Sequence, residues 1–221
     1  MAALAEGLSA KGVTRGMIVL RHAARHYDSD NPLNEPFMGL TEEGKNMAFD
    51  WGRRFPINTC LNFFSSNIGR CIETAYLIDK GYAAAGGRTR TNVIESTLSP
   101  FYVRDVRRLF ETYFNESDFF PQWFAGDIPS DVISPPEKIA RTQRSFWEQR
   151  LEDESQSVEG WDIGVTHDWN LYVLRYCFLG LPYEVQKKVD YMDGVIVYRE
   201  KAGCRITAPG LAPTVLSGNG H

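Results

Sequence analysis

The chain has 221 residues, a net charge of −4 and 43% hydrophobic residues, which is typical of one sizeable globular domain. The acidic balance gives no argument for nucleic-acid binding, and no apolar run has the length of a signal peptide core or a membrane-spanning helix. We therefore expect a cytoplasmic protein with neither a nucleic-acid nor a membrane partner.

The four cysteines show no pattern typical of a bound metal or a disulfide framework. Cys60, Cys71, Cys177 and Cys204 include no Cys-x-x-Cys pair. We expect four ordinary thiols, as in proteins of a reducing compartment. No metal site is expected either, because the chain has only four histidines, and one of them is the C-terminal His221.

Short apolar runs alternate with helical segments after a loose leader at 1–16. Strands are predicted at 16–21, 61–65, 91–95, 162–166, 192–199 and 205–208, and helices at 41–55, 69–85 and 168–179. Thr41 is a suitable N-cap, and Glu42 and Glu43 favour the positive end of the helix that follows. This alternation predicts an α/β fold with a mostly parallel central sheet flanked by helices on both faces.

The segment 96–154 interrupts this alternation. It is rich in aromatic residues and helical signals, so we predict an inserted helical cap within a single domain that spans 1–221. The aromatic side chains either form the core of this cap or wall a pocket that selects an organic leaving group. Arg104, Arg107 and Arg108 either lie on a solvated helix face or bind a second anionic group of a substrate.

Three polar clusters each follow a short apolar strand. They are Arg21-His22-Ala23-Ala24-Arg25, Ser65-Ser66-Asn67-Ile68-Gly69-Arg70 and Thr166-His167-Asp168. Ligands of open parallel α/β sheets bind beyond the carboxyl ends of the strands. If these strands are neighbours, the three clusters meet at one place.

The residues gathered there suit a phosphate group. Arg21, Arg25 and Arg70 supply forked cationic donors for its oxygens. A neutral His22 could attack phosphorus through one ring nitrogen, while the other needs a backbone acceptor that fixes the tautomer. The arginines and His167 would stabilise the charge on the phosphoryl oxygens, which points to metal-free phosphoryl transfer.

Several motifs occur in an order that resembles the histidine phosphatase superfamily, which includes the phosphoglycerate mutases and the histidine acid phosphatases. They are the Arg21-His22 pair, Leu40-Thr41-Glu42-Glu43-Gly44, Ser65-Ser66 leading to Arg70, Thr74-Ala75 and the late His167. The chain departs from the family pattern where Ala23 replaces the usual glycine and Tyr27 replaces the proline of the acid-phosphatase branch.

The resemblance implies that His22 is the nucleophile, that Arg21, Arg25, Arg70 and His167 form the phosphate pocket, and that no cofactor takes part. It is consistent with a phosphatase, and the aromatic segment favours a small organic phosphomonoester over a phosphoprotein as its substrate. The proton donor is either Asp168, as in the acid-phosphatase branch, or Glu95, as in the mutase-like branch. We favour Asp168 because it adjoins a matched motif residue.

Two alternative functions stay open at this point. A phosphomutase of the same fold would return the phosphate to another hydroxyl group. A non-catalytic phosphate-binding module would retain the pocket without turnover. The sequence defines neither the physiological substrate nor the oligomeric state.

Overall fold

The computed structural model describes residues 1–28, 31–56, 59–114, 118–152, 160–186, 188–201 and 203–216, so His221 lies outside it. The strands are β1 (Arg15–Arg21), β2 (Cys60–Ser65), β3 (Arg88–Ile94), β4 (Gly160–Thr166), β5 (Gly194–Glu200), β6 (Gly203–Thr207) and β7 (Thr214–Val215). The longer helices are α1 (Ala2–Ala10), α2 (Glu42–Arg54), α3 (Gly69–Ala84), α5 (Phe119–Ala125), α6 (Pro136–Glu152) and α7 (Asp168–Leu179). Shorter helical pieces are η1 (Pro32–Phe37), η2 (Ser96–Leu98), α4 (Val106–Arg108), η3 (Leu109–Tyr113) and η5 (Tyr183–Val185).

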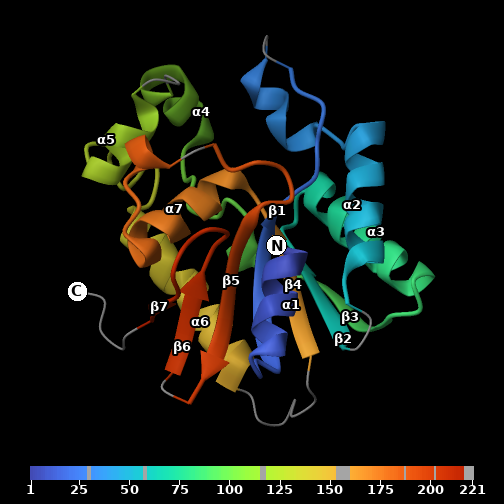
Figure 1. The fold of residues 1–221 in the computed structure, drawn as a ribbon. Helices are drawn as coiled ribbons and strands as arrows, with labels where there is room; N and C mark the ends of the chain where they lie inside the picture. The colour runs from blue at the N-terminus through green and yellow to red at the C-terminus, as the bar shows by residue number, and fades with distance from the viewer. Residues whose placement is uncertain are drawn as a thin grey trace.

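The strands form one mixed sheet with the order β3-β2-β4-β1-β5-β6-β7 (Figure 1). The first four strands in this order run parallel to one another, and β5, β6 and β7 each run antiparallel to the strand before them. The predicted α/β fold with a mostly parallel central sheet is therefore confirmed. β4 and β1 lie at its centre, which puts the predicted site at the middle of the sheet edge.

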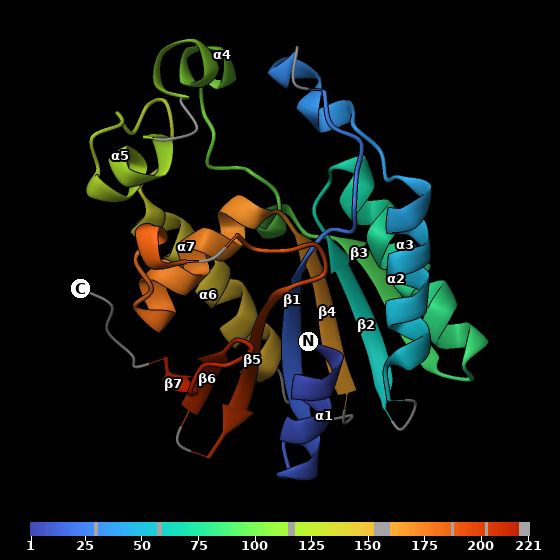
Figure 2. The ribbon, with the colours of Figure 1, turned by 45° about the horizontal axis from the view of Figure 1, so that its top comes forward.

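Helices cover both faces of this sheet. Successive side chains of a strand point to opposite faces, and since those of β1 are buried on both faces, each face is covered. Ile18 and Leu20 of β1 belong to the core under α1, α2 and α3, whereas Met17 and Val19 belong to the core under α6 and α7. Figure 2 shows these two groups of helices on opposite sides of the sheet.

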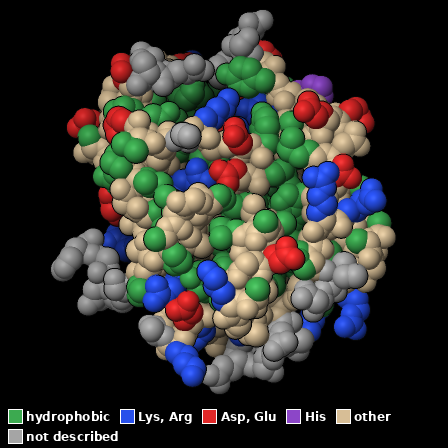
Figure 3. All heavy atoms as spheres, viewed as in Figure 1, with side chains coloured by type: hydrophobic (Ala, Val, Ile, Leu, Met, Phe, Trp, Pro, Cys, Tyr) green, Lys and Arg blue, Asp and Glu red, His purple; other side chains and the backbone are tan. Residues whose placement is uncertain are grey.

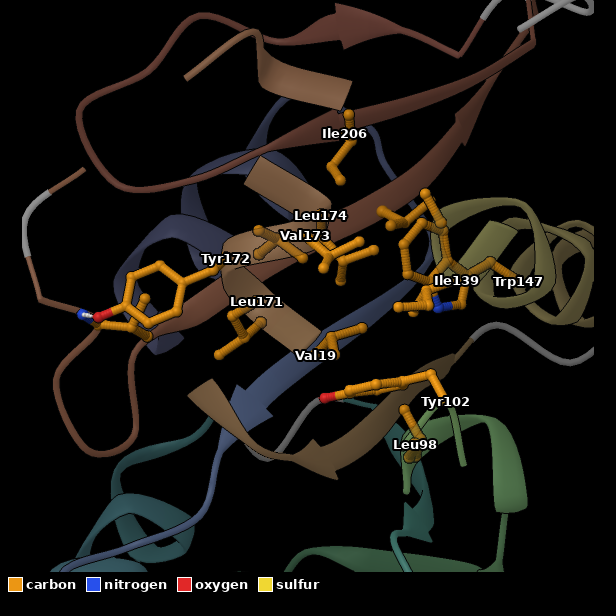
Figure 4. Close-up of a cluster of buried hydrophobic side chains, with 14 of the residues drawn as sticks. Val19, Leu98, Tyr102, Ile139, Trp147, Leu171, Tyr172, Val173, Leu174 and Ile206 are labelled. Atoms are coloured by element: carbon orange, nitrogen blue, oxygen red, sulfur yellow. Dashed lines mark hydrogen bonds between the residues drawn. The ribbon is translucent and has the colours of Figure 1, made fainter. Parts of the chain in front are cut away.

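The core on the α6–α7 side fixes the strand ends near the site. Trp147 of α6 and Leu171 of α7 pack there with Val19 of β1, and Leu98 and Tyr102 continue the cluster (Figure 4). All five side chains are fully buried. Burying one large apolar side chain contributes on the order of 1.5–3 kcal/mol to the stability of the fold. This cluster therefore stabilises the positions of the strand ends and of the residues that follow them.

Two parts of the predicted organisation differ in the structure. The predicted loose leader 1–16 is wrong, because it contains α1, whose Ala5 and Leu8 are buried in the core. Alanine is the strongest helix former, and these two residues lie on one helix face. The predicted cap segment 96–154 divides in two. Its α6 packs on α7 and the sheet, whereas α4, η3 and α5 stand above the sheet edge (Figure 2). Residues 153 and 154 lie outside the described residues.

The four cysteines are free thiols, two buried and two half-buried. None of the helices in the described part of the chain is long and apolar enough to cross a bilayer.

Candidate active site

The three polar clusters meet at the carboxyl ends of β1, β2 and β4. The parallel register pairs Arg21 with Thr166 and Ser65 with Val165, so His22, Ser66 and His167 follow their strands at the same level. The predicted convergence can be measured directly. Arg70 Nε lies 3.1 Å from His22 Nε2, and Arg70 Nη2 lies 3.2 Å from His167 Nδ1. The two imidazole centroids are 5.6 Å apart.

The surroundings of His22 select one tautomer. Its Nδ1 lies 2.8 Å from the carbonyl oxygen of Ala23, and a carbonyl only accepts, so Nδ1 carries the proton. Nε2 is then unprotonated and accepts a hydrogen bond from Arg70 Nε. Burial, followed by the charge of Arg70, lowers the pKa of His22 well below its ordinary value. His22 therefore presents a neutral nitrogen lone pair to the arginine cluster.

The partners of His167 fix its ring as well. Arginine only donates, so His167 Nδ1 accepts from Arg70 Nη2, and Nε2 donates to Ser66 Oγ at 2.9 Å. Ser66 Oγ also accepts from the backbone N–H of Ile68 at the start of α3. Burial and then the charge of Arg70 lower the pKa of His167 well below its ordinary value.

A direct test of these two imidazoles is a histidine NMR titration. A free imidazole takes up its proton around a pKa of about 6.5. Because burial and Arg70 disfavour the cation, we expect His22 and His167 to stay neutral as the pH falls from 7.5 to 5.5. Spectra of the His22→Gln and His167→Gln variants assign the two signals. A titration midpoint near the free value for either ring would contradict this electrostatic description.

Arg21 binds the protein on two sides. Its Nη1 donates to the carbonyl oxygen of Val189 at 2.6 Å, and its Nη2 forms an ion pair with Asp168 Oδ2 at 2.8 Å. The guanidinium lies over the ring of Tyr191, 4.4 Å from its centroid. Asp168 is the first residue of α7, and its other carboxylate oxygen accepts the N–H of Trp169. Arg21 thereby holds Asp168 beside the histidines.

Glu35 is a further residue of this site, and the sequence did not indicate it. Its Oε1 lies 3.0 Å from Nη2 of both Arg25 and Arg70, and its backbone oxygen accepts from Arg70 Nη1 at 2.8 Å. Burial raises the pKa of Glu35, against the opposite effect of Arg70 and Arg25. Its Oε2 is buried without a hydrogen-bond partner in the described part of the chain. The Glu35 carboxylate is thus paired with Arg25 and Arg70, the two guanidinium groups that were predicted to bind phosphate.

Replacing Glu35 should therefore strengthen phosphate binding. A carboxylate and a phosphate would compete for the same donors and repel each other. We expect Glu35→Gln to bind inorganic phosphate about tenfold more tightly than the wild type, a difference of about 1.4 kcal/mol, in isothermal titration calorimetry. Glu111→Gln is the matched control, because Glu111 is exposed and pairs with Arg107. Unchanged or weaker binding would show that Glu35 does not occupy the anion position.

The threonine motifs hold the chain that follows His22. The N–H of Ala23 donates to Thr74 Oγ1 at 3.1 Å, and the N–H of Thr41 donates to the oxygen of Ala24 at 3.0 Å. Thr41 Oγ1 accepts the N–H of Gly44, as predicted for an N-cap. A Cβ atom at Gly44 would overlap with the oxygen of Ala24, so only glycine allows α2 to approach this closely. These contacts position the His22 loop from two helices.

A cavity of about 260 Å³ opens above these groups, and Arg25, Arg70, His167 and Asp168 line it. Arg21 and His22 lie behind this lining and are only 5% and 2% exposed. Glu95 lies at the same sheet edge, where its N–H donates to the Ser65 oxygen at 2.8 Å. It follows β3, accepts the N–H of Thr97 at 2.9 Å and is not among the lining residues in the described part of the chain. Within the same described residues, no group of three histidine, cysteine or acidic side chains is placed to hold a metal ion.

Several solved structures of other proteins are similar to this chain, although no protein-family model and no curated protein sequence matches it. Each match covers most of both chains, and the two percentages in parentheses are the matched shares of this chain and of the other chain. Phosphoglycerate mutase from Bacillus anthracis is 16% identical with a TM-score of 0.55 (88% and 92%). A mutant phosphoserine phosphatase from Entamoeba histolytica with bound phosphoserine is 14% identical with a TM-score of 0.56 (88% and 95%). Mycobacterial glucosyl-3-phosphoglycerate phosphatase with VO3 is 16% identical with a TM-score of 0.59 (89% and 98%).

These matches define the fold. The chain is an α/β protein built like phosphoglycerate mutase over at least 88% of its length. More specifically, it has the fold of the histidine phosphatase superfamily, as the order of its sequence motifs predicted.

Proposed function

We propose that this protein is a metal-independent phosphatase that hydrolyses a small organic phosphomonoester through a phosphohistidine on His22. The observation that carries the proposal is the neutral His22 ring, with Nδ1 bonded to the Ala23 oxygen and Nε2 facing Arg70 at 3.1 Å. An unprotonated nitrogen among fixed guanidinium groups suits attack on a bound phosphate. The proposal includes a cytoplasmic location and no cofactor.

In the first step the substrate phosphate takes the place of the Glu35 carboxylate between Arg25 and Arg70. His22 Nε2 donates its lone pair to phosphorus, and the bond between phosphorus and the ester oxygen breaks. Arg70, the other arginines and His167 stabilise the charge on the phosphoryl oxygens. The leaving oxygen takes a proton from a carboxylic acid, which leaves an alcohol and the phosphohistidine.

In the second step water attacks the phosphohistidine. The carboxylate formed in the first step accepts the proton of this water, and the bond between phosphorus and His22 Nε2 breaks to release inorganic phosphate. The Nδ1–H bond to the Ala23 oxygen supports the phosphorylated ring, which carries more positive charge than the free ring.

We assign the acid to Asp168 rather than Glu95. Asp168 lines the cavity with His167 and is held at 2.8 Å by Arg21, whereas the carboxylate of Glu95 caps η2. The distance from Glu95 Oε1 to the Thr97 nitrogen, 2.9 Å, supports a structural part for Glu95.

The test is to trap the intermediate. Wild-type protein is mixed with a radiolabelled phosphomonoester, quenched within one turnover and divided between acid and base. We expect protein-bound label that is labile in acid and stable in base, together with release of inorganic phosphate. Transfer of the label to another hydroxyl group would identify a mutase instead. Stabilisation by phosphate without turnover of any phosphomonoester would identify a non-catalytic binding module.

A further inference from the structure

The cavity above the phosphate position has an aromatic and aliphatic wall. Beyond Arg25, Arg70 and His167, six of its lining residues come from the segment above the sheet edge and from the start of α7. They are Tyr102, Val103, Val106, Phe110, Phe114 and Trp169. Figure 3 shows charged side chains between hydrophobic ones near the top of the molecule. In the same view of Figure 1, α4 and the blue segment that contains η1 lie at this end of the molecule.

This wall is supported from behind. The rings of Phe114 and Trp169 are stacked with centroids 5.9 Å apart, and those of Phe110 and Phe114 are 4.9 Å apart. Trp169 also packs on Phe119 at 4.8 Å, and Phe119 is fully buried. Since Trp169 directly follows Asp168, the wall begins beside the residue to which we assign the proton donor.

The wall offers no cation to a second anionic group. In the described part of the chain, the cationic residues that line the cavity are Arg25 and Arg70, which the transferred phosphate would occupy. The three other arginines of this region bind elsewhere: Arg104 donates to Ser134 Oγ at 3.2 Å, Arg107 pairs with Glu111 at 2.8 Å, and Arg108 pairs with Asp131 at 2.9 Å. These contacts favour a structural part for the three arginines over a part in substrate binding.

The acidic residues of the lining also disfavour a second anionic group on the substrate. Asp28 and Glu35 also line the cavity, so a carboxylate or second phosphate on the leaving group would face like charges. One neutral polar group of the lining is available to bind the leaving group. The hydroxyl group of the fully buried Tyr102 has no hydrogen-bond partner in the described residues, and Tyr102 lines the cavity. Burial raises the pKa of Tyr102 well above its ordinary value, so it stays a hydrogen-bond donor.

We infer that the leaving group of the substrate is uncharged and largely apolar or aromatic, and that the cavity selects against a second anionic group. The inference rests on the proposed phosphatase function and names the substrate class of that site. The leaving group would lie against Phe110, Phe114 and Trp169, and one of its neutral oxygen or nitrogen acceptors would take a hydrogen bond from Tyr102.

Three alkyl phosphates test this inference, because their leaving groups have similar intrinsic reactivity. We compare kcat/KM for phenethyl phosphate, glycerol phosphate and phosphoglycerate, which carry an aromatic, a neutral polar and an anionic group. We expect phenethyl phosphate to exceed phosphoglycerate by at least about 100-fold, a ratio that a shaped apolar pocket with opposing charge can supply.

Two variants of the wall should change this ratio. Phe110→Ala should lower it by about tenfold through lost contact with the phenyl ring. Val106→Lys should lower it by raising kcat/KM for phosphoglycerate, and this position tolerates lysine because Val106 is 46% exposed. Arg107→Ala is the matched control on the same short helix, and we expect it to leave the ratio unchanged.

The failures are distinguishable. Turnover with no preference for phenethyl phosphate, or a ratio that neither Phe110→Ala nor Val106→Lys changes, would overturn the inference and leave the proposed function intact. Absence of turnover with all three compounds would overturn the proposed function and this inference with it.

Discussion

The His22→Ala variant should lose at least about 10³-fold in kcat, because no other group in the pocket replaces the nucleophile. The bond from His22 Nδ1 to the Ala23 oxygen fixes the tautomer, so His22 Nε2 is unprotonated. Nε2 lies 3.1 Å from Arg70 Nε, within the arginine cluster. Steady-state release of phosphate from an alkyl phosphomonoester measures the effect.

The matched control is His26→Ala, which removes an exposed imidazole four positions away. We expect that variant to keep wild-type kcat. Thermal unfolding of both variants separates lost chemistry from lost structure, since His22 is buried and accepts from Arg70. Turnover by a folded His22→Ala protein at the wild-type rate would end the phosphohistidine mechanism.

The convergence of the site was predictable from the sequence for a definite reason. Each apolar run is a buried parallel strand, and polar residues begin where the strand leaves the core, as at Arg21, Ser66 and His167. Strand ends of a parallel sheet share one edge, so position in the chain predicted position in space. The Thr41 capping motif was equally local, because a side chain and the N–H of Gly44 three residues later suffice to form it.

The missing parts of the site come from segments without periodicity. Glu35 lies in the short helical piece η1, its contacts are with two arginines from other parts of the chain, and nothing in its sequence neighbours distinguishes it from a solvated acid. Tyr191 meets Arg21 through the turn before β5, a contact between residues 170 positions apart. Tyr102 belongs to the core cluster and also lines the cavity, and its sequence neighbours do not predict the second of these placements. Each of these needs tertiary contacts that no local pattern encodes.

The placement of α6 shows the same limit in the fold. Its sequence carries helical spacing, but the choice between a cap and a sheet face depends on which surface receives Ile139 and Trp147. The sequence-based interpretation kept 96–154 together because no strand interrupts it. In the structure the chain returns to the sheet before β4, as a crossover helix between parallel strands must.

The second large effect is expected from Arg70→Lys. Arg70 bonds to His22, His167 and Glu35 together, through Nε and both terminal nitrogens. Lysine keeps the charge but has a single nitrogen and no planar fork, so it cannot hold both imidazoles and the phosphate at once. We expect kcat/KM to fall by about 10²- to 10³-fold, the range for removal of one preorganised donor of transition-state charge.

Two measurements make this prediction specific to the geometry of the fork. Arg107→Lys is the control, because Arg107 is exposed and pairs with Glu111 outside the cavity, and it should keep wild-type kcat/KM. The histidine NMR spectrum of Arg70→Lys should show altered signals for both His22 and His167, because each loses its partner at 3.1 and 3.2 Å. If Arg70→Lys retained wild-type kcat/KM, positive charge alone would suffice at this position, and the fork would have no part in stabilising the transition state.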